Sequence, residues 1–285
     1  MAAKRGATLR SQWLGKHLRE LRETAGLTLK EAGEYLQRDA STVSRFEAGL
    51  YPARTSDVVA LLDLYGIADM HRREGLIRLS REVWQSGWWD AYSDDMPLGI
   101  VHYAWLEARA EKISSFDAMV IPGLLQTRDY LEAVIRAEDT EAPEEQITRW
   151  IEFRLERQKL LSTDAPDFSM VLDEYALRRM VGGPETMRHQ LAQLTKHASQ
   201  PNIEIRVLPF SAGAHASPDG SFRIFELPEP YAAVAYAPTP AGAIYAEGEA
   251  ATKLKMKYDR IRHDALNVED SLELIAAIAE QTRLP

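Results

Sequence analysis

Residues 14–54 read LGKHLRELRETAGLTLKEAGEYLQRDASTVSRFEAGLYPAR, and this stretch decides the fold of the N-terminal part of the chain. Leu14, Leu18 and Leu21 recur at the spacing of one helix face, which predicts a first helix. Gly26 can adopt the left-handed conformation that commonly ends a helix, so we expect this helix to stop there.

A second helix is predicted to begin directly after this stop. Thr28 is its expected N-cap, and Glu31, three residues later, completes a capping box. Ala32 and Leu36 form its inward face, and the turn Gln37-Arg38-Asp39 then leads into a third helix.

The third helix is predicted to start at Asp39 as N-cap, to point Val43 and Phe46 inward, and to end at Gly49. A further helix is expected over residues 69–86. Between them a fourth helix, capped by Thr55 or Ser56, should cover the other three with Val58, Leu61, Leu62 and Tyr65.

Two short helices joined by a tight turn make a helix-turn-helix, which places the third helix of this chain in the DNA major groove. Its outward positions are Ala40, Ser41, Thr42, Ser44 and Arg45. Small hydroxyl side chains allow close approach, and Arg45 can make a forked contact with guanine or reach a phosphate. The alternative is an ordinary helical bundle with a solvated polar face.

The same residues resemble the helix-turn-helix of the Xre family, also known as the phage-repressor Cro/C1 family. The segments LRELRETAGLT and STVSRFEAG and the loop with Pro52 carry the resemblance. In that family an arginine of the first helix pairs with the glutamate that ends the third. The resemblance therefore implies that Arg22 and Glu47 form a structural bridge and do not contact DNA.

Three positions depart from the family pattern. Gly33 stands where alanine is usual, which loosens the second helix slightly. Gln37 stands in the turn where glycine is favoured, which makes a positive φ more costly there. Leu29 replaces a glutamine that often contacts DNA, so the second helix is expected to offer its backbone amides and Lys30.

The predicted partner is double-stranded DNA. Arg45 is expected to read a base, whereas Lys30 and Arg54 lie where a backbone phosphate is expected. The full predicted set of DNA-contacting residues is Thr28, Lys30, Arg38, Ala40, Ser41, Thr42, Ser44, Arg45 and Arg54.

Charge is unevenly distributed along the chain. The 285 residues carry a net charge of −9, which alone argues against a nucleic-acid partner. Residues 1–54 nevertheless hold ten Lys/Arg and six Asp/Glu, a net of +4, whereas residues 82–285 carry −13. A basic head on an acidic body indicates that only the head meets an anionic polymer, although chance can also produce an excess of four charges.

Composition and motifs exclude several classes of protein. The chain has no cysteine, so disulfides, zinc fingers and cysteine nucleophiles are ruled out. The sequence has no apolar run long enough for a membrane span and no secretory signal pattern. A cytoplasmic location is expected, on the nucleoid when the protein is bound to DNA.

Catalytic motifs are missing from the sequence. It contains no G-x-x-x-x-G-K-[ST], G-x-S-x-G or H-E-x-x-H segment. Residues 213–220, GAHASPDG, bring His, Ser and Asp together, but a triad is assembled across a fold, so a turn between strands is predicted. We expect no enzymatic activity, no cofactor and no metal.

Beyond residue 81 the pattern is mixed. Helices are predicted over residues 101–115, 124–137, 144–161, 174–181, 184–198, 248–264 and 268–281, and strands over 167–172, 203–208, 221–227, 231–237 and 242–246. The predicted fold class is therefore a mainly α N-terminal helix-turn-helix bundle plus an α+β C-terminal domain.

Six segments in this portion carry a second resemblance. They are IPGLLQTRDY (121–130), RLERQKLL (154–161), VLDEYALRRMVGG (171–183), QLAQL (190–194), IRVLPFSAGAH (205–215) and GSFRIFELP (220–228). They resemble the C-terminal domain of actinobacterial Xre-type regulators of the WhiJ-like, antitoxin-like type, a domain of unknown function. The resemblance implies a transcriptional regulator, often encoded beside a small partner protein.

Polar residues inside these segments form a candidate site for a ligand or partner. Arg154 and Gln158 lie on or beside the apolar stripe of one helix, so their polar groups need partners. Glu174, Gln126 and Gln190 are candidates for that role. The alternative is a satisfied hydrogen-bond network that only fixes the domain.

Four of the six tryptophans, Trp84, Trp88, Trp89 and Trp105, lie close together in the sequence. A ligand cage or dimer seam is one interpretation, and hydrophobic packing between domains is the commoner use of such residues. The candidate ligand- or partner-binding set is Gln126, Arg154, Gln158, Glu174, Trp88 and Trp89.

Three regions are predicted: a DNA-binding domain (1–80), a Trp-rich helical connector (81–118), and an α+β regulatory or partner-binding domain (119–285). The leading hypothesis is a homodimeric, sequence-specific transcriptional regulator whose C-terminal domain senses a small-molecule effector or binds a protein. The alternative is an antitoxin-like protein that binds a small partner protein and autoregulates through its DNA-binding head.

Overall fold

The computed structural model describes residues 8–85, 87–92, 96, 98–161, 166–229 and 231–282. Internal contacts divide the chain into two compact units, residues 1–90 and 91–285. The predicted connector, residues 81–118, is thus shared between the two units. The first seven residues of the predicted DNA-binding domain, and residues 86, 93–95 and 97 of the connector, lie outside the described residues.

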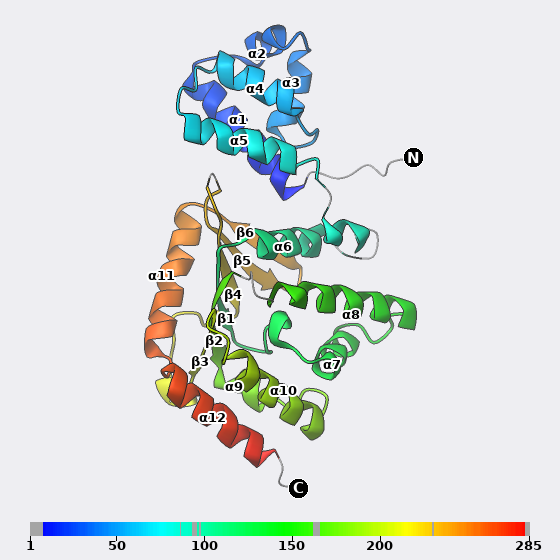
Figure 1. The fold of residues 1–285 in the computed structure, drawn as a ribbon, viewed down its shortest axis with the longest axis vertical. Helices are drawn as coiled ribbons and strands as arrows, with labels where there is room; N and C mark the ends of the chain where they lie inside the picture. The colour runs from blue at the N-terminus through cyan, green and yellow to red at the C-terminus, as the bar shows by residue number, and fades with distance from the viewer. Residues whose placement is uncertain are drawn as a thin grey trace. The chain divides into compact units, whose positions relative to one another are not determined.

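The described part of the N-terminal unit is a helical bundle (Figure 1). Its helices are α1 (Leu9–Thr24), α2 (Leu29–Tyr35), α3 (Ala40–Glu47), α4 (Thr55–Leu64) and α5 (Met70–Glu82). The predicted capping box of Thr28 and Glu31 is confirmed. Gly26 and Gly49 follow α1 and α3 with φ angles of 71° and 68°, as their role in ending a helix requires.

A small apolar core holds the first four helices together. Leu18, Ala32, Val43, Val58 and Leu61 are fully buried and come from α1, α2, α3 and α4. Complete burial of one large aliphatic side chain contributes about 1.5–3 kcal/mol. The spacing of these residues in the sequence therefore accounts for the packing of the bundle.

Close contacts around α3 depend on glycine. A Cβ on Gly15 would lie 2.4 Å from the carbonyl oxygen of Phe46, and a Cβ on Gly33 would lie 2.8 Å from that of Arg38. Gly33 therefore permits the close approach of α2 to the following turn, in addition to loosening its helix. In that turn Gln37 has a φ of 54°, the one positive φ outside glycine among the described residues.

The start of α4 differs from the sequence-based expectation, whereas the start of α3 agrees with it. α4 has Arg54 at its N-cap, whereas Thr55 or Ser56 was expected there. The Thr55 hydroxyl instead accepts a hydrogen bond from Ser80 Oγ at 3.1 Å. Asp39 does occupy the N-cap of α3, but its side chain makes no capping hydrogen bond.

The helix expected over residues 69–86 is shorter in the structure. α5 ends at Glu82, and the chain then turns. Trp84 Nε1 donates a hydrogen bond of 3.1 Å to the carbonyl oxygen of Ala53, in the loop before α4. This long-range contact within the N-terminal unit competes with continuation of the helix.

The C-terminal unit is built on a six-stranded sheet of order β3-β2-β1-β4-β5-β6. The strands are β1 (Lys112–Asp117), β2 (Asp167–Asp173), β3 (Ile203–Leu208), β4 (Phe222–Glu226), β5 (Val234–Thr239) and β6 (Gly242–Ala246). β1 is parallel to β2, with Ile113 opposite Phe168, and antiparallel to β4, with Ile113 opposite Phe225. Together with the helical N-terminal unit, this mixed sheet and its helices confirm the predicted fold class.

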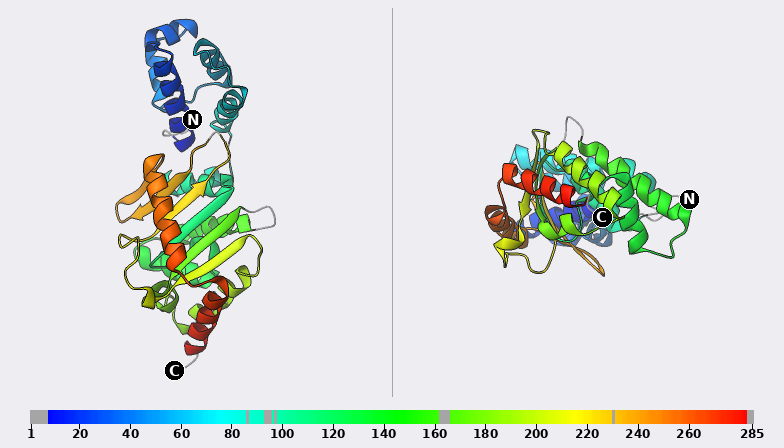
Figure 2. Two further views of the ribbon diagram at one scale, coloured as in Figure 1. Left: turned by 90° about the vertical axis from the view of Figure 1, so that its left-hand side faces the viewer. Right: turned by 90° about the horizontal axis from the view of Figure 1, so that it is seen from below.

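Helices cover both faces of the sheet (Figures 1 and 2). They are α6 (Leu98–Arg109), α7 (Arg128–Glu138), α8 (Glu144–Gln158), α9 (Glu174–Arg178), α10 (Pro184–His197), α11 (Glu249–Asp264) and α12 (Val268–Gln281). On one face, Tyr258 and Ile261 of α11 belong to a core cluster with Phe116 and Val171 of the sheet. α6, α7 and α8 lie over the opposite face.

β1 is the main correction to the sequence-based expectation. The helix predicted over residues 101–115 ends at Arg109, and β1 follows in the middle of the sheet. Every β1 residue after Lys112 is buried, so the strand lacks the polar and apolar alternation of a half-exposed strand. Its hydrogen-bond ladders to β2 and β4 stabilise it, and no local pattern reports them.

Other elements of the C-terminal unit differ from expectation only at their ends. Thr127 caps α7, so that helix starts at Arg128, and residues 123–125 form a separate 3-10 turn. α8 ends at Gln158, α9 ends at Arg178, and β5 starts at Val234.

Candidate DNA-binding face and ligand cavity

An ion pair fixes α1 against the end of α3. Nε and Nη2 of Arg22 donate to the two carboxylate oxygens of Glu47 at 2.7 and 2.9 Å, and Nη1 donates to the carbonyl oxygen of Leu27 at 2.8 Å. The side chains of Arg22 and Glu47 are only 10% and 6% exposed. The hydrogen bonds to Glu47 raise the pKa of Arg22 despite its burial. The pair therefore acts as scaffold that sets the direction of α3.

The outward face of α3 is open to solvent. Ser41, Ser44 and Arg45 are exposed, and Ala40 and Thr42 are half-buried. Within the part of the chain that the structure describes, no hydrogen bond or ion pair engages the side chains of Ser41, Ser44 or Arg45. These polar groups are therefore available to a partner at no cost in internal contacts.

The remaining predicted DNA contacts differ in availability. Arg54 is exposed, and its head has no partner among the described residues. Lys30 makes one exposed pair at 3.8 Å, which contributes little and is easily exchanged for a phosphate. Thr28 uses its hydroxyl in the capping box. Nη2 of Arg38 lies 3.2 Å from both carboxylate oxygens of Asp57, so its head ties the turn before α3 to α4.

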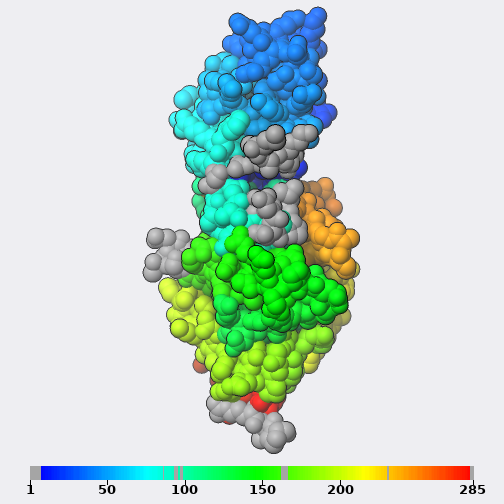
Figure 3. All heavy atoms as spheres, turned by 90° about the vertical axis from the view of Figure 1, so that its right-hand side faces the viewer, coloured from blue at the N-terminus to red at the C-terminus, as the bar shows by residue number. Residues whose placement is uncertain are grey.

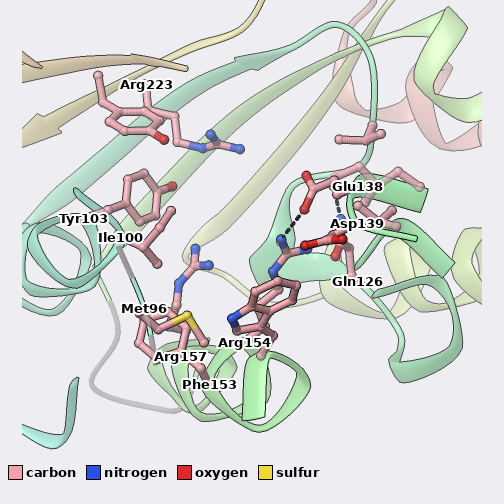
Figure 4. Close-up of a pocket in the computed structure, with 16 residues that line it drawn as sticks. Met96, Ile100, Tyr103, Gln126, Glu138, Asp139, Phe153, Arg154, Arg157 and Arg223 are labelled. Carbon is pink, nitrogen blue, oxygen red and sulfur yellow. Dashed lines mark hydrogen bonds and ion pairs between the residues drawn. The ribbon is translucent and has the colours of Figure 1, made fainter. Parts of the chain in front are cut away.

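A cavity of about 410 Å³ lies in the C-terminal unit, between the sheet and the helices that cover this face (Figure 4). Figure 3 looks onto α7 and α8, drawn in green, which form the outer surface here. Ile100 of α6, Val134 of α7, and Trp150 and Phe153 of α8 supply apolar walls. The loop after β1 contributes Ile121, so the cavity lies at the carboxyl end of that strand, where α/β sheets commonly hold ligands.

Two buried ion pairs border the cavity. Nε and Nη2 of Arg157 donate to the two oxygens of Glu107 at 2.7 and 2.8 Å, and Arg223 donates to Asp117 Oδ1 at 2.5 Å. The Glu107 and Asp117 side chains are 2% and 3% exposed. Both guanidinium groups lie over the ring of Tyr103, at 4.9 and 5.7 Å from its centroid.

Burial and charge act in opposite directions on these groups. Burial raises the pKa of Asp117, and the charge of Arg223 only partly offsets it. Burial alone would lower the pKa of Arg157, but the carboxylate of Glu107 outweighs it and raises that pKa. Burial also raises the pKa of the Tyr103 hydroxyl well above its usual value, so the phenol stays protonated.

Arg154 is the most exposed of the three arginines at the cavity. Its Nη2 donates to Glu138 Oε2 at 3.0 Å, and the two side chains are 25% and 63% exposed. Gln126 also lines the cavity, donating its amide to the carbonyl oxygen of Ile121 while its buried Oε1 has no hydrogen-bond partner. Gln158 supports the wall from behind, since its amide donates to the backbone carbonyl of Gln126 at 2.8 Å.

The structure separates the other candidate residues from this cavity. Glu174 begins α9, where its carboxylate accepts hydrogen bonds from Arg178 Nε and from the backbone N–H of Phe210. Gln190 bonds the backbone of Leu125 and Thr127. These two side chains are not the partners of Arg154 and Gln158.

The tryptophans have separate packing roles. Trp88 and Trp89 lie edge to face with ring centroids 5.8 Å apart, and neither lines the cavity. Trp105 is buried in α6 against Tyr231, at a centroid distance of 5.7 Å. The four residues expected as one group are thus used in different local contacts.

Sequence reasoning missed the most buried residues of the site. It selected Gln126 and Arg154, but not Glu107, Asp117 or Arg157. The signal was present for Arg157, which lies three residues after Arg154 in the segment RLERQKLL. The ion-pair partners are 50 and 106 residues apart in the chain, and no local spacing reports such pairs.

Other features of the chain are simpler. Residues 213–220 form turns between β3 and β4, as predicted, with the Ser217 hydroxyl donating to the carbonyl oxygen of Gly220. Among the described residues, no group of three or more His, Asp or Glu side chains is arranged to hold a metal ion. In the same residues, every helix is too short or too polar to cross a bilayer.

Comparisons with known families match both units. The family described as "Domain of unknown function (DUF5753)" matches residues 100–277, which is more than half of the chain. The family described as "Helix-turn-helix domain" matches residues 13–75. No curated protein and no solved structure matches the chain.

Proposed function

The chain belongs to the DUF5753 family, and from this membership and the helix-turn-helix domain ahead of it we propose that it is a sequence-specific, DNA-binding transcriptional regulator with a C-terminal sensor domain. The observation that carries the DNA-binding half is the face of α3. Its Ser41, Ser44 and Arg45 are exposed and unengaged, while the ion pair of Arg22 with Glu47 holds the helix from behind.

The chemistry of this face suits the major groove. Hydroxyl groups donate to or accept from base edges, and Arg45 can fork onto a guanine. Arg54, beside α4, is free to bind a phosphate and set the register of the helix on the duplex. Arg38, held by Asp57, contributes chiefly to the scaffold.

We further propose that the protein works as a homodimer of the Xre type in the cytoplasm. A single head of this size buries too little surface for tight operator binding, and two heads on a symmetric operator double it.

The C-terminal cavity supports a sensor in preference to an antitoxin-like, partner-neutralising protein. Its walls enclose a volume in the usual range for small molecules, whereas protein partners commonly dock on flat or grooved surfaces. The side chains around it offer aromatic surface and hydrogen-bond donors, which favours a binding role over catalysis. A small polypeptide that co-purifies with the chain from the native cell would favour the alternative.

The direct test of DNA reading uses genome-wide binding of the tagged protein to find an operator. Binding of wild type, Arg45→Ala and Arg19→Ala is then compared on that operator and on a scrambled duplex. Arg19 is the matched control, because it is an exposed arginine of α1 whose partner is Glu23.

We expect Arg45→Ala to lower operator discrimination by about 1–3 kcal/mol and Arg19→Ala to leave it unchanged. If Arg45→Ala only flattens the salt dependence and keeps the specificity ratio, Arg45 is a phosphate contact. The absence of discrete genomic sites for the wild-type protein would contradict the proposed function.

A further inference from the structure

Three guanidinium groups face the cavity of the C-terminal unit. Arg154 and Arg157 come from α8 and Arg223 comes from β4, and Figure 4 shows their heads directed toward a common space. Each guanidinium has five N–H groups. The structure engages one group of Arg154, two of Arg157 and one of Arg223, so most of these donors have no protein acceptor.

The two buried carboxylates nearby are already engaged. Both oxygens of Glu107 bind Arg157, while Asp117 accepts from Arg223 through Oδ1 and from the Ser115 hydroxyl through Oδ2. Neither carboxylate lines the cavity. The space in front of the arginines therefore holds many N–H donors without an acceptor, and a ligand with acceptor oxygens would pair with them.

Arg154 has a partner that can be replaced. Glu138 holds it through one hydrogen bond, and the Glu138 side chain is 63% exposed. When another carboxylate takes its place, Glu138 loses little because water can solvate it at once. An incoming acid thus exchanges with Glu138 instead of breaking a buried pair.

The other residues of the cavity lining determine which part of a ligand, apart from its acceptor group, fits there. Trp150, Phe153 and Ile100 present flat and branched apolar surface to the same space. Glu138 and Asp139 also line the cavity, and their charge opposes a dianion such as a phosphate ester.

We propose that this cavity binds a small organic acid, one carboxylate on an aromatic or branched apolar body, whose carboxylate takes the free N–H groups of Arg154 and Arg157 in place of Glu138. A carboxylate matches the forked geometry of a guanidinium, which a neutral amide does not, while the charges of Glu138 and Asp139 disfavour the second negative charge of a phosphate ester. This ligand class specifies what the sensor proposed above would bind. Only the effect of the ligand on DNA binding rests on that proposed sensor role.

The test is calorimetry on the full-length protein with a panel of matched probes. The acids are benzoate, 3-phenylpropanoate, indole-3-acetate and 4-methylpentanoate, each beside its primary amide, and phenyl phosphate is the dianionic probe. We expect at least one acid to bind about 10-fold or more tightly than its amide and than phenyl phosphate. Failure of every acid to bind at millimolar concentration overturns the proposal.

Three variants then assign the site on the acid that binds best. Arg154→Gln should weaken binding about 10-fold or more, because it removes the exchangeable cation. Glu138→Gln should strengthen binding about 3-fold or more, because it removes the competing carboxylate. Arg188→Gln, at a side chain of α10 that is 42% exposed and does not line the cavity, is the control and should change nothing.

The opposite signs of the first two variants separate binding from folding, since a merely damaged domain cannot gain affinity. Equal affinity for acid and amide, or an unchanged affinity in both Arg154→Gln and Glu138→Gln, overturns the proposal. Operator binding is measured on the same preparations. If the acid binds as stated but leaves operator affinity unchanged, the cavity inference stands and the sensor role is wrong.

Discussion

Gln37 has a backbone conformation that is unfavourable for a residue with a side chain. Its φ of 54° lies in the left-handed region, which costs a residue with a Cβ about 1–2 kcal/mol. Glycine adopts this conformation freely but loses more entropy on folding. We expect Gln37→Gly to stabilise the N-terminal unit by about 0.5–1 kcal/mol, measured as slower hydrogen exchange of α2 and α3 amides in the full chain.

A matched variant tests the cause of that gain. Gly33→Ala, four positions earlier, places a Cβ 2.8 Å from the carbonyl oxygen of Arg38 and should cost about 1–3 kcal/mol. Faster exchange in Gln37→Gly would show that the side chain of Gln37 stabilises the turn more than its backbone destabilises it.

Glu204 joins three parts of the C-terminal unit. Its carboxylate accepts hydrogen bonds from Arg206 and Ser169 and, from α11, Arg262. Burial acts to raise the pKa of Glu204, but these hydrogen bonds outweigh it and hold the pKa below its ordinary 4.5. The contribution to stability is therefore complete above about pH 4.5 and is lost as pH falls through the lowered pKa.

We predict that Glu204→Gln destabilises the protein by about 1–3 kcal/mol at pH 7 and by much less near pH 3, measured by denaturant unfolding at both pH values. Glu273→Gln, at an exposed position of α12 with no hydrogen bond or ion pair to the other described residues, is the control with no expected change. An equal loss of stability at both pH values would mean that packing, and not the charge of Glu204, supplies the stabilisation.

For individual residues, the sequence predicts an ion pair only where a known motif contains both partners. Arg22 and Glu47 are 25 residues apart, and the family resemblance pairs them. Arg157 and Glu107 have no such motif, because their contact depends on how α8 and α6 pack on the sheet. The expected pairing of Glu174 with Arg154 or Gln158 failed for the same reason, since its polar partners, Arg178 and Phe210, lie along α9 and after β3.

Among the elements, helices with local signals could be predicted and β1 could not. Thr28 and Glu31 mark the start of α2, and the apolar spacing of Val43 and Phe46 marks α3. β1 depends on neighbours that enter the sheet much later in the chain, so its residues look like the tail of α6. The segment after β1 supplies Val120, Ile121, Gly123 and Gln126 to the cavity lining, and for that reason the site could be located from the sequence only in part.

We predict that α3 reads bases and that residues beside it bind phosphates. Arg54→Ala should weaken binding to operator and scrambled DNA alike and reduce the slope of log affinity against log salt by about 1, because it removes one phosphate contact. Ser41→Ala should instead change base preference with the salt slope intact. Filter binding at four salt concentrations checks both, and a change in specificity with Arg54→Ala would place Arg54 against a base.

The ion pair between α6 and α8 is the critical contact of the cavity wall. Arg157→Met leaves Glu107 charged and buried, which should cost about 3–5 kcal/mol. The double variant Arg157→Met/Glu107→Leu removes both charges and should recover most of that loss. Denaturant unfolding of the two variants tests this, and equal stability of the single and double variants would show that Glu107 is not left uncompensated.

On the scale of the whole molecule, the charge division predicts which unit binds DNA. Residues 1–54 carry +4 and residues 82–285 carry −13. A fragment of residues 1–90 should bind DNA weakly and lose affinity steeply with salt, whereas residues 91–285 should not bind. Electrophoretic mobility shifts of the two fragments test this, and full affinity in residues 91–285 would contradict the proposed DNA-binding role of the head.

The position of β1 has a consequence for the order in which the protein is made. Asp117 at its end pairs with Arg223, 106 residues later, and β1 lies between β2 and β4 in the sheet. β1 therefore cannot pair with both of its neighbouring strands until most of the chain has been synthesised. Contacts of such sequence separation also form slowly. The helical head is a compact unit within the first 90 residues and is complete long before. Each new molecule thus has a finished α3 while the cavity of its C-terminal unit does not yet exist.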